Sequence, residues 1–367
     1  MLIAVSTVMD TVEHVRRHVA GNLAGGADHV VVFLDRPRGA GQAEVAAFLD
    51  EHPHATGVRA GVDWWGEERP RELNERQCTN ANLAKQVLAD AGLRGWVAHI
   101  DGDEILRCDR GVLDGLSSAQ TAVRFAVRET VSRRSWDGEP TWFKRLLPDA
   151  DLHLLHGLGL IAEPTNQAYL SGHLMGKSAA RIEAPVWLTL HKVVDAAHVG
   201  LEPVEDETAF ELFHYESYSA EEFARKWTAM VASGPRASYR AERRSTAATM
   251  RALINRGLEP AALERRIVAY YERFLLEDAE ALHDLGVLVE TDPLRPRDPA
   301  RVPEPVAGDV LAAGFEAAAG RPKAPFFHGT SPGGRGLASA GSDTRSDARS
   351  DTDAGSDAGR RGWRRRS

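Results

Sequence analysis

The first hundred residues alternate between short apolar runs and stretches with apolar residues at helical spacing. The runs predict strands, and the spaced stretches predict helices. In chain order the predicted elements are a strand at 2–6, a helix from about 11 to 25, a strand at 29–34, a helix at 42–49, a strand at 56–60, a helix at 72–91 and a strand at 96–100. This alternation predicts an α/β fold with a parallel sheet and right-handed crossovers.

The last of these strands runs directly into three acids, Asp101, Asp103 and Glu104. Acids so close together repel one another unless a cation or hydrogen bonds neutralise them. Ligands of an open α/β sheet bind at the carboxyl ends of its strands. The Asp-x-Asp pattern at this point therefore predicts a divalent metal site that faces a diphosphate, with a plain Asp-Gly-Asp turn as the alternative.

Two other strand ends favour the metal site over the turn. Ser6 ends the first strand and Asp35 follows the second, so a parallel sheet would bring both to the same edge as Asp101. The chain has no G-x-G-x-x-G after its first strand and no G-x-x-x-x-G-K-[ST]. These absences exclude a dinucleotide fingerprint and a P-loop.

The pattern changes in the second half of the chain. Short strands with polar ends are predicted there, at 121–131, 176–182, 186–192 and 210–215, around an irregular stretch at 140–172. Such a half is typical of an acceptor-binding region beside a nucleotide-binding half. A capping-box start at Ser219 then opens a series of helices. They are predicted at 219–231, 236–256 and 260–285.

The end of the chain is poor in apolar residues. Residues 291–328 are predicted as a proline-rich linker with a weak helix at 309–319, and 329–367 as a disordered tail. The tail ends in a basic run at 360–366, which could make peripheral contact with an acidic membrane surface. A solvated tail without specific function is the favoured alternative.

Composition narrows the class of protein. The chain has 367 residues and a formal net charge of -8, and nucleic-acid binders usually carry a basic excess, so nucleic acid is not an expected partner. Cys78 and Cys108 are the two cysteines, so no disulfide framework is implied, and free thiols are expected. The start of the chain lacks a basic n-region and no apolar run reaches about 18 residues. A cytoplasmic protein is therefore expected.

Several of these features together resemble the glycosyltransferase family 2-like group of GT-A enzymes, in the branch whose acid motif reads roughly Asp-x-Asp-Glu. Ile105 stands where that branch usually has Phe. The resemblance covers roughly residues 1–230. It rests on the segment 25–35 with Gly-Gly-Ala-Asp-His before an apolar strand, on Arg76-Gln77, on 96–106, on Gly176-Lys177, Arg181 and His191, and on His214-Tyr215 before Ser219-x-x-Glu222-Phe223-x-x-Lys226.

The resemblance implies a Rossmann-like GT-A fold with a mixed central sheet, C-terminal helices and a disordered tail. Residues 1–230 would be the catalytic domain, with a nucleotide-sugar-binding half at 1–106 and an acceptor half at 107–230, and 231–290 a helical extension. The implied reaction moves a sugar from a nucleotide-sugar donor to a glycan, lipid-linked or small-molecule acceptor, with inversion. The implied cofactor is Mn²⁺ or Mg²⁺, which would stabilise the departing nucleoside diphosphate.

The resemblance also implies roles for single residues. Asp35 would bind the base, Asp101 would face the ribose or sugar, and Asp103 would bind the metal. The remaining candidates for the donor site are Ser6, Arg76, Lys177 and Arg181, and the metal candidates are Asp101, Asp103, His191 and His214. A structural histidine is the alternative for His191 and His214, and a solvated strand edge for Lys177 and Arg181.

An inverting transferase needs a carboxylate that takes a proton from the acceptor hydroxyl. Glu129 is the preferred candidate because it follows the strand that begins near Thr121, and Asp137, Glu139 and Glu163 remain open. Two other functions remain as alternatives. One is a metal-dependent phosphoesterase that uses the same acids, and the other is a non-catalytic binding protein of GT-A type.

Overall fold

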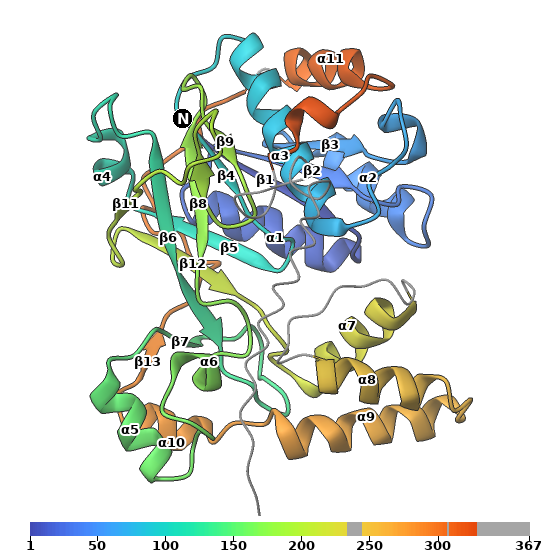
Figure 1. The fold of residues 1–367 in the computed structure, drawn as a ribbon, viewed down its shortest axis with the longest axis vertical. Helices are drawn as coiled ribbons and strands as arrows, with labels where there is room; N and C mark the ends of the chain where they lie inside the picture. Colours follow the sequence, from blue (N-terminus) through green and yellow to red (C-terminus); the bar gives the residue numbers. More distant parts are fainter. Residues whose placement is uncertain (233–243, 307, 329–367) are drawn as a thin grey trace, which may run out of the picture.

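The computed structural model of the chain describes residues 1–232, 244–306 and 308–328 (Figure 1). Within these residues, eleven strands form one mixed sheet in the order β13-β7-β6-β8-β4-β1-β2-β3, in which β11 also pairs with β6, and β12 pairs with β5 and β6. The strands are β1 (Leu2–Val8), β2 (His29–Leu34), β3 (Ala55–Arg59), β4 (Trp96–His99), β5 (Glu104–Cys108), β6 (Ala122–Thr130), β7 (Trp142–Lys144), β8 (Lys177–Arg181), β11 (Val204–Glu205), β12 (Phe210–His214) and β13 (Leu288–Glu290).

The first half of the chain forms the predicted parallel β-α-β unit. Strands β1 and β2, β2 and β3, and β1 and β4 pair in parallel. Three crossover helices connect them, α1 (Val12–Ala24), α2 (Gln42–Glu51) and α3 (Leu73–Asp90). The apolar runs and helical spacings therefore predicted these elements to within two residues at most ends, and the predicted parallel order is confirmed.

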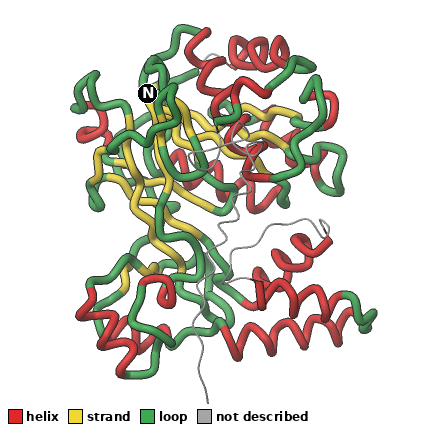
Figure 2. The backbone as a smooth tube through the Cα atoms, in the orientation of Figure 1, coloured by secondary structure: helices red, strands yellow, loops and turns green. Residues whose placement is uncertain are grey.

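Helices cover both faces of this parallel unit, as Figure 2 shows. Alternate residues of β2 point to opposite sides: Val30 and Val32 pack with α1 and α2, whereas Val31 and Phe33 pack with α3. Helix α11 (Gly308–Ala318) joins α3 on its face through Phe315. A strand that is buried on both sides has no polar alternation, which explains the continuous apolar run of β2.

The rest of the sheet is mostly antiparallel and extends the first half. Strand β8 pairs antiparallel with both β4 and β6, and β12 pairs antiparallel with β5 and parallel with β6. Figure 1 shows β6 running from the upper body of the molecule down to β7, β13 and the helices of the lower part. The predicted strands at 121–131, 176–182 and 210–215 are confirmed.

Two predictions for the strand-rich part of the second half are wrong. The irregular stretch 140–172 contains β7 and two helices, α5 (Asp149–Gly157) and α6 (Asn166–Tyr169). The strand predicted at 186–192 is reduced to β9 (Trp187–Leu188), which, among the described residues, forms a two-stranded sheet with β10 (Val193–Val194). In both places tertiary pairing decides the local structure, and short apolar runs do not reveal it.

The helical region begins with α7 (Ala220–Ala232), whose predicted cap is confirmed because the Glu222 N–H donates to Ser219 Oγ. Helices α8 (Arg244–Ile254) and α9 (Pro260–Phe274) pack against α7 around Phe223 and Tyr271. The predicted start of α8 at 236 lies outside the described residues. The predicted single helix 260–285 is wrong, because the chain leaves α9 at Leu275 and starts a new helix, α10 (Ala279–Asp284).

The segment 292–305 forms no helix or strand, as predicted, but it is fixed to the first half of the chain. Arg301 pairs with the buried carboxylate of Asp28, which also accepts from the Glu304 N–H at 2.9 Å. The weak helix predicted at 309–319 is confirmed as α11. The tail 329–367 lies outside the described residues. None of the helices in the described ranges is long and apolar enough to span a bilayer.

Candidate metal site at the end of strand β4

The acid turn lies at the carboxyl end of β4, where Asp101-Gly102-Asp103 connects β4 to β5. Gly102 packs so closely on β1 that an added Cβ would lie 2.6 Å from Val8 Cγ1. The Asp101 N–H donates to Glu104 Oε2 at 2.6 Å. The side chains of Asp101 and Asp103 are 27% and 29% exposed and that of Glu104 is fully buried. The three acids therefore lie at different depths of one site, with Asp101 and Asp103 partly exposed and Glu104 buried.

Two histidines from distant parts of the chain join these acids. His173 follows α6 and places its Nε2 2.6 Å from Glu104 Oε1, and His214 is the last residue of β12. Their rings stack with centroids 5.1 Å apart. Two groups of three side chains have ligand atoms within 4.8 Å of one another: Glu104 with His173 and His214, and Asp103 with His214 and Glu216. Carboxylate oxygens with one or two imidazoles form a donor set that fits a divalent metal ion, better Mn²⁺ than Mg²⁺.

Lys177 neutralises the inner acids. It is fully buried, and its Nζ lies 2.8 Å from Asp101 Oδ2 and 3.8 Å from Glu104 Oε2. Gln77 donates to the other oxygen of Asp101 at 2.6 Å. Burial raises the pKa of Asp101, but Lys177 outweighs burial and holds the pKa below its usual value. Burial raises the pKa of Glu104 to about 7, so Glu104 is partly protonated near neutral pH.

Lys226 neutralises the outer acids, Asp103 and Glu216. Its Nζ lies 2.8 Å from Asp103 Oδ2 and 2.9 Å from Glu216 Oε2. Burial raises the pKa of Asp103, but Lys226 and His214 together lower it below its usual value. Asp103 is therefore ionised at neutral pH, which a metal ligand requires.

Glu129 lies next to this cluster but is closed off from solvent. Its carboxylate accepts from the N–H groups of Ser171 and Gly172 and pairs with Lys144 at 2.9 Å. Its Oε2 is 3.9 Å from His214 Nδ1. Burial raises the pKa of Glu129, but Lys144 and His214 outweigh it and lower the pKa below its usual value. Glu129 thus holds the loop that carries His173 in place.

The structure brings several of the sequence-predicted residues together. Asp101, Asp103, Lys177, His214 and Glu129 all lie in or beside the cluster described above. His191 is adjacent, with its ring centroid 4.7 Å from that of His173, but its Nδ1 hydrogen-bonds to the Gly176 carbonyl, and it belongs to neither three-residue group.

Other predicted residues lie apart from the cluster. Ser6 Oγ shares a 2.7 Å hydrogen bond with His18 Nε2. Asp35 follows β2 at the expected edge, where Arg76 binds both of its oxygens at 2.7 and 2.9 Å. Arg181 pairs opposite Trp96, at the far end of β4 from the acids, and donates to main-chain carbonyls. Their roles in donor binding stay predictions.

His173, Glu216 and Gln77 were missed as site residues. Glu216 follows His214 by two positions, a spacing that puts two side chains on one side of an extended chain. Gln77 stands beside Arg76 on α3, one of the residues that carry the resemblance. His173 lies in an irregular, histidine-rich stretch and gave no signal of its own.

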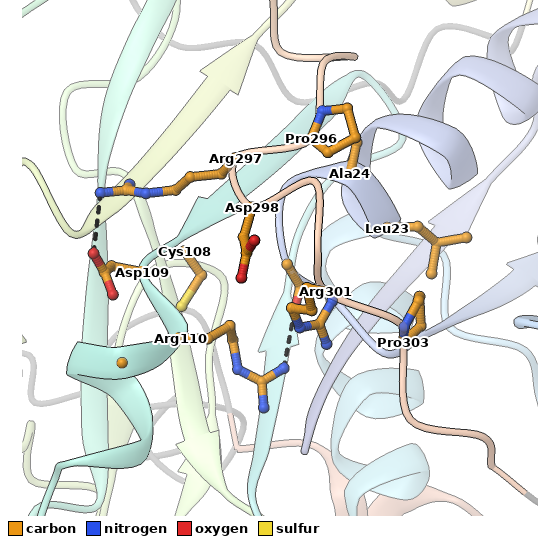
Figure 3. A pocket seen from close by; sticks show the side chains of 12 residues that line it. Leu23, Ala24, Cys108, Asp109, Arg110, Pro296, Arg297, Asp298, Arg301 and Pro303 are labelled. Atoms are coloured by element: carbon orange, nitrogen blue, oxygen red, sulfur yellow. Dashed lines mark hydrogen bonds and ion pairs between the residues drawn. The ribbon is translucent and has the colours of Figure 1, made fainter.

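A separate pocket of about 490 Å³ lies at the other end of β5, beside Cys108 and the end of α1. Figure 3 shows its charged side chains, among them Arg297, which reaches Asp109 at 3.4 Å. Arg110 and Arg301 also line it, and both pair with Asp28. These arginines fasten the segment 296–303 to the first half of the chain.

A comparison with models of protein families gives no match for this chain, and a comparison with curated protein sequences gives none either.

Proposed function

We propose that the protein is a metal-dependent glycosyltransferase of GT-A type that moves a sugar from a nucleoside-diphosphate donor to an acceptor. One observation carries the proposal. A cluster of carboxylates and histidines that fits one divalent ion lies at the carboxyl end of the parallel strand β4, on the same edge of the sheet as Asp35, which follows β2 on the far side of β1. In an open α/β sheet this edge is the usual place for a nucleotide.

In this proposal the outer group, Asp103, His214 and Glu216, would hold Mn²⁺, and the ion would supply the positive charge that stabilises a departing diphosphate. Gln77 and Lys177 hold the two oxygens of Asp101 in place, and Asp101 would face the ribose or sugar of the donor. Lys177 is too deeply buried to reach a phosphate itself, so it acts by orienting Asp101. Asp35, at the same edge of the sheet, is the residue proposed to bind the nucleotide base.

Glu129 remains the proposed base of the transfer. Its lowered pKa keeps it ionised but also makes it a weaker base, and it lies beside His214. Its oxygens accept hydrogen bonds from two N–H groups and pair with Lys144, so these contacts would have to open before Glu129 could take a proton from an acceptor. A Glu129→Gln variant that folds normally and keeps full transfer activity would remove Glu129 from this role.

The test of the donor site is a thermal-shift panel with UDP, GDP, dTDP and CDP, each with and without Mn²⁺. A ligand that binds only the folded protein raises its melting temperature. One nucleotide should give a Mn²⁺-dependent rise that is lost in Asp103→Ala and kept in Glu51→Ala, since Glu51 is an exposed acid at the end of α2. Absence of any nucleotide-dependent shift in the wild type would contradict the proposal.

A second candidate is a metal-dependent phosphoesterase. It is favoured by one observation, the two ligand groups that share His214, because many phosphoesterases use a pair of metal ions. Hydrolysis of p-nitrophenyl phosphate with Mn²⁺, without hydrolysis of any nucleotide sugar, would select this candidate. Metal binding without either activity would indicate a non-catalytic binding protein.

The acceptor stays a prediction, whether glycan, lipid-linked or small molecule. The same holds for a cytoplasmic location with peripheral membrane contact through residues 360–366, which lie outside the described residues.

A further inference from the structure

The ammonium group of Lys226 lies where the outer ligand group would hold a metal ion. It contacts Asp103 Oδ2 at 2.8 Å and Glu216 Oε2 at 2.9 Å. The same two oxygens lie 3.8 and 3.6 Å from His214 Nε2. A monovalent cation that belongs to the chain therefore contacts two of the three ligand atoms that a divalent ion would use.

Lys226 lies at the outer side of the cluster. Its side chain is 25% exposed and that of Asp103 is 29% exposed, whereas Glu216 is 4% exposed and Glu104 is fully buried. An ion that arrives from solvent would therefore meet Lys226 and Asp103 before it reaches Glu216. Lys226 stands at the entrance of the site.

The helix that carries Lys226 is fixed on both sides of this residue. Arg225 pairs with Asp10 at 2.7 Å, and Glu222 lies 3.1 Å from His14 Nε2. Trp227 is buried against α8 and α9. The lysine side chain itself has a flexible four-carbon stem. The ammonium group can therefore leave the two carboxylates by side-chain rotation while the helix stays where it is.

We propose that Lys226 is a built-in counter-cation, which a divalent metal ion displaces from Asp103 and Glu216. Without an ion, the ammonium group keeps the two carboxylates from repelling each other. An ion and the ammonium group compete for the same oxygens and repel each other, so they exclude one another. The displaced ammonium group stays at the entrance, where it faces an arriving anion such as a donor diphosphate. The inference rests on the metal site of the proposed function and is independent of the transfer chemistry.

The test is a titration of the full-length protein with MnCl₂, in which electron paramagnetic resonance measures free Mn²⁺. Lys226→Met removes the competing charge and should lower the Kd for Mn²⁺ at least fivefold, and Lys226→Gln should act in the same direction. Lys226→Arg keeps the charge and should stay within about twofold of the wild type. Lys192→Met is the matched control, because Lys192 is exposed and its loss removes one positive charge elsewhere.

The metal-free proteins provide a second measurement. Lys226→Met should melt at a lower temperature than the wild type without metal, and saturating Mn²⁺ should raise its melting temperature by more. An unchanged or higher Kd in both neutral variants would overturn the inference, and so would a failure of wild type and variants alike to bind Mn²⁺. Tighter Mn²⁺ binding in the variants without nucleotide-sugar turnover by the wild type would keep the inference and reject the transferase.

Discussion

Two bridges of the form carboxylate–lysine–carboxylate lie on either side of His214, and they differ in their access to solvent. In the sealed bridge, Lys144 joins Glu129 and Glu277 at 2.9 and 2.6 Å. Lys144 is fully buried and Glu129 is 1% exposed, and only the outer carboxylate, Glu277, is 20% exposed. The open bridge is the one described above, in which Lys226 joins Asp103 and Glu216. His214 Nδ1 faces the sealed bridge at 3.9 Å, and its Nε2 faces the open one at 3.8 Å.

The comparison shows that burial determines how much stability is lost when the lysine of such a bridge is removed. A buried ion pair has lost its water, so removal of one partner leaves an uncompensated charge in a medium of low dielectric. A partly exposed pair regains water when it opens, and its net contribution is small. The sealed bridge is therefore suited to holding the loop of His173 in place, and the open bridge to exchanging its cation.

The largest effect should separate the two lysines. Lys144→Met leaves Glu129 and Glu277 without their ammonium partner and should lower the free energy of unfolding by about 3–5 kcal/mol. Lys226→Met should lower it by about 1 kcal/mol or less. Urea unfolding followed by tryptophan fluorescence measures both values under one set of conditions.

A compensated variant tests the cause of the larger loss. If uncompensated charge is responsible, Lys144→Met combined with Glu129→Gln and Glu277→Gln should be more stable than Lys144→Met alone, since no buried charge is left unpaired. Equal losses for the two single lysine variants would contradict the distinction between a sealed and an open bridge.

Acid should lower the stability of the folded protein through His18, which lies beneath the turn of Asp101 and Asp103. Its ring contacts Ser6 Oγ at 2.7 Å and the Glu104 carbonyl oxygen at 3.0 Å. Burial lowers the pKa of His18 from 6.5 to about 4. The unfolded chain binds a proton at this residue below pH 6.5, whereas the folded chain does so only near pH 4. The contribution of His18 to stability should therefore fall by about 3 kcal/mol as the pH drops from 6.5 to 4.

Urea unfolding at pH 7 and at pH 4.5 checks this sign and size. His18→Gln cannot titrate and should show a smaller loss of stability between the two pH values than the wild type. His153→Gln, on the exposed side of α5, should lose as much as the wild type. A loss in His18→Gln equal to that of the wild type would assign the acid sensitivity to other groups.

The parallel half could be predicted from the sequence because its signals are local. The run 29–34 is apolar at nearly every position and becomes β2, and Gly25-Gly26 ends α1 as expected. Asp101 and Asp103 could be placed at one edge of the sheet because each parallel strand ends at that edge. Such inferences need only the period of the apolar residues and the direction of the strands.

The site residues from the second half of the chain could not be predicted in this way, because their positions depend on strand register and tertiary contacts. Lys177 and Arg181 lie four residues apart on β8, a separation of about 13 Å, so only one of them can reach the acids. Because β8 runs antiparallel to β4 with Arg181 opposite Trp96, the residue that reaches Asp101 is Lys177. Nothing in the local pattern distinguishes the two.

The helix break after α9 is also caused by tertiary contacts. Glu277 turns inward to bind Lys144 at 2.6 Å and to accept from the Ser132 N–H at 2.7 Å, and the chain leaves the helix before it. Both partners lie more than 130 residues away along the chain. The apolar spacing of 260–285 carries no trace of these contacts, so it predicted one helix where there are two.

A further prediction concerns Gly172, which lies between Glu129 of the sealed bridge and His214. A Cβ at this position would lie 2.5 Å from Glu129 Oε2 and 2.6 Å from two ring atoms of His214. Gly172→Ala must therefore move the loop or the histidine ring, and overpacking of this kind costs about 1–3 kcal/mol. Because His214 belongs to both ligand groups, the same displacement should raise the Kd for Mn²⁺ about tenfold.

Gly157→Ala is the matched control, since an added Cβ there meets nothing within 4 Å, and Gly157 lies in α5. Alanine favours helix over glycine by about 0.5–1 kcal/mol, so this variant should be as stable as the wild type or slightly more stable, with unchanged Mn²⁺ binding. A Gly172→Ala protein that loses stability but binds Mn²⁺ as the wild type does would mean that the loop yields and His214 stays in place. The sealed bridge would then support the fold alone, without positioning the ligands of the open one.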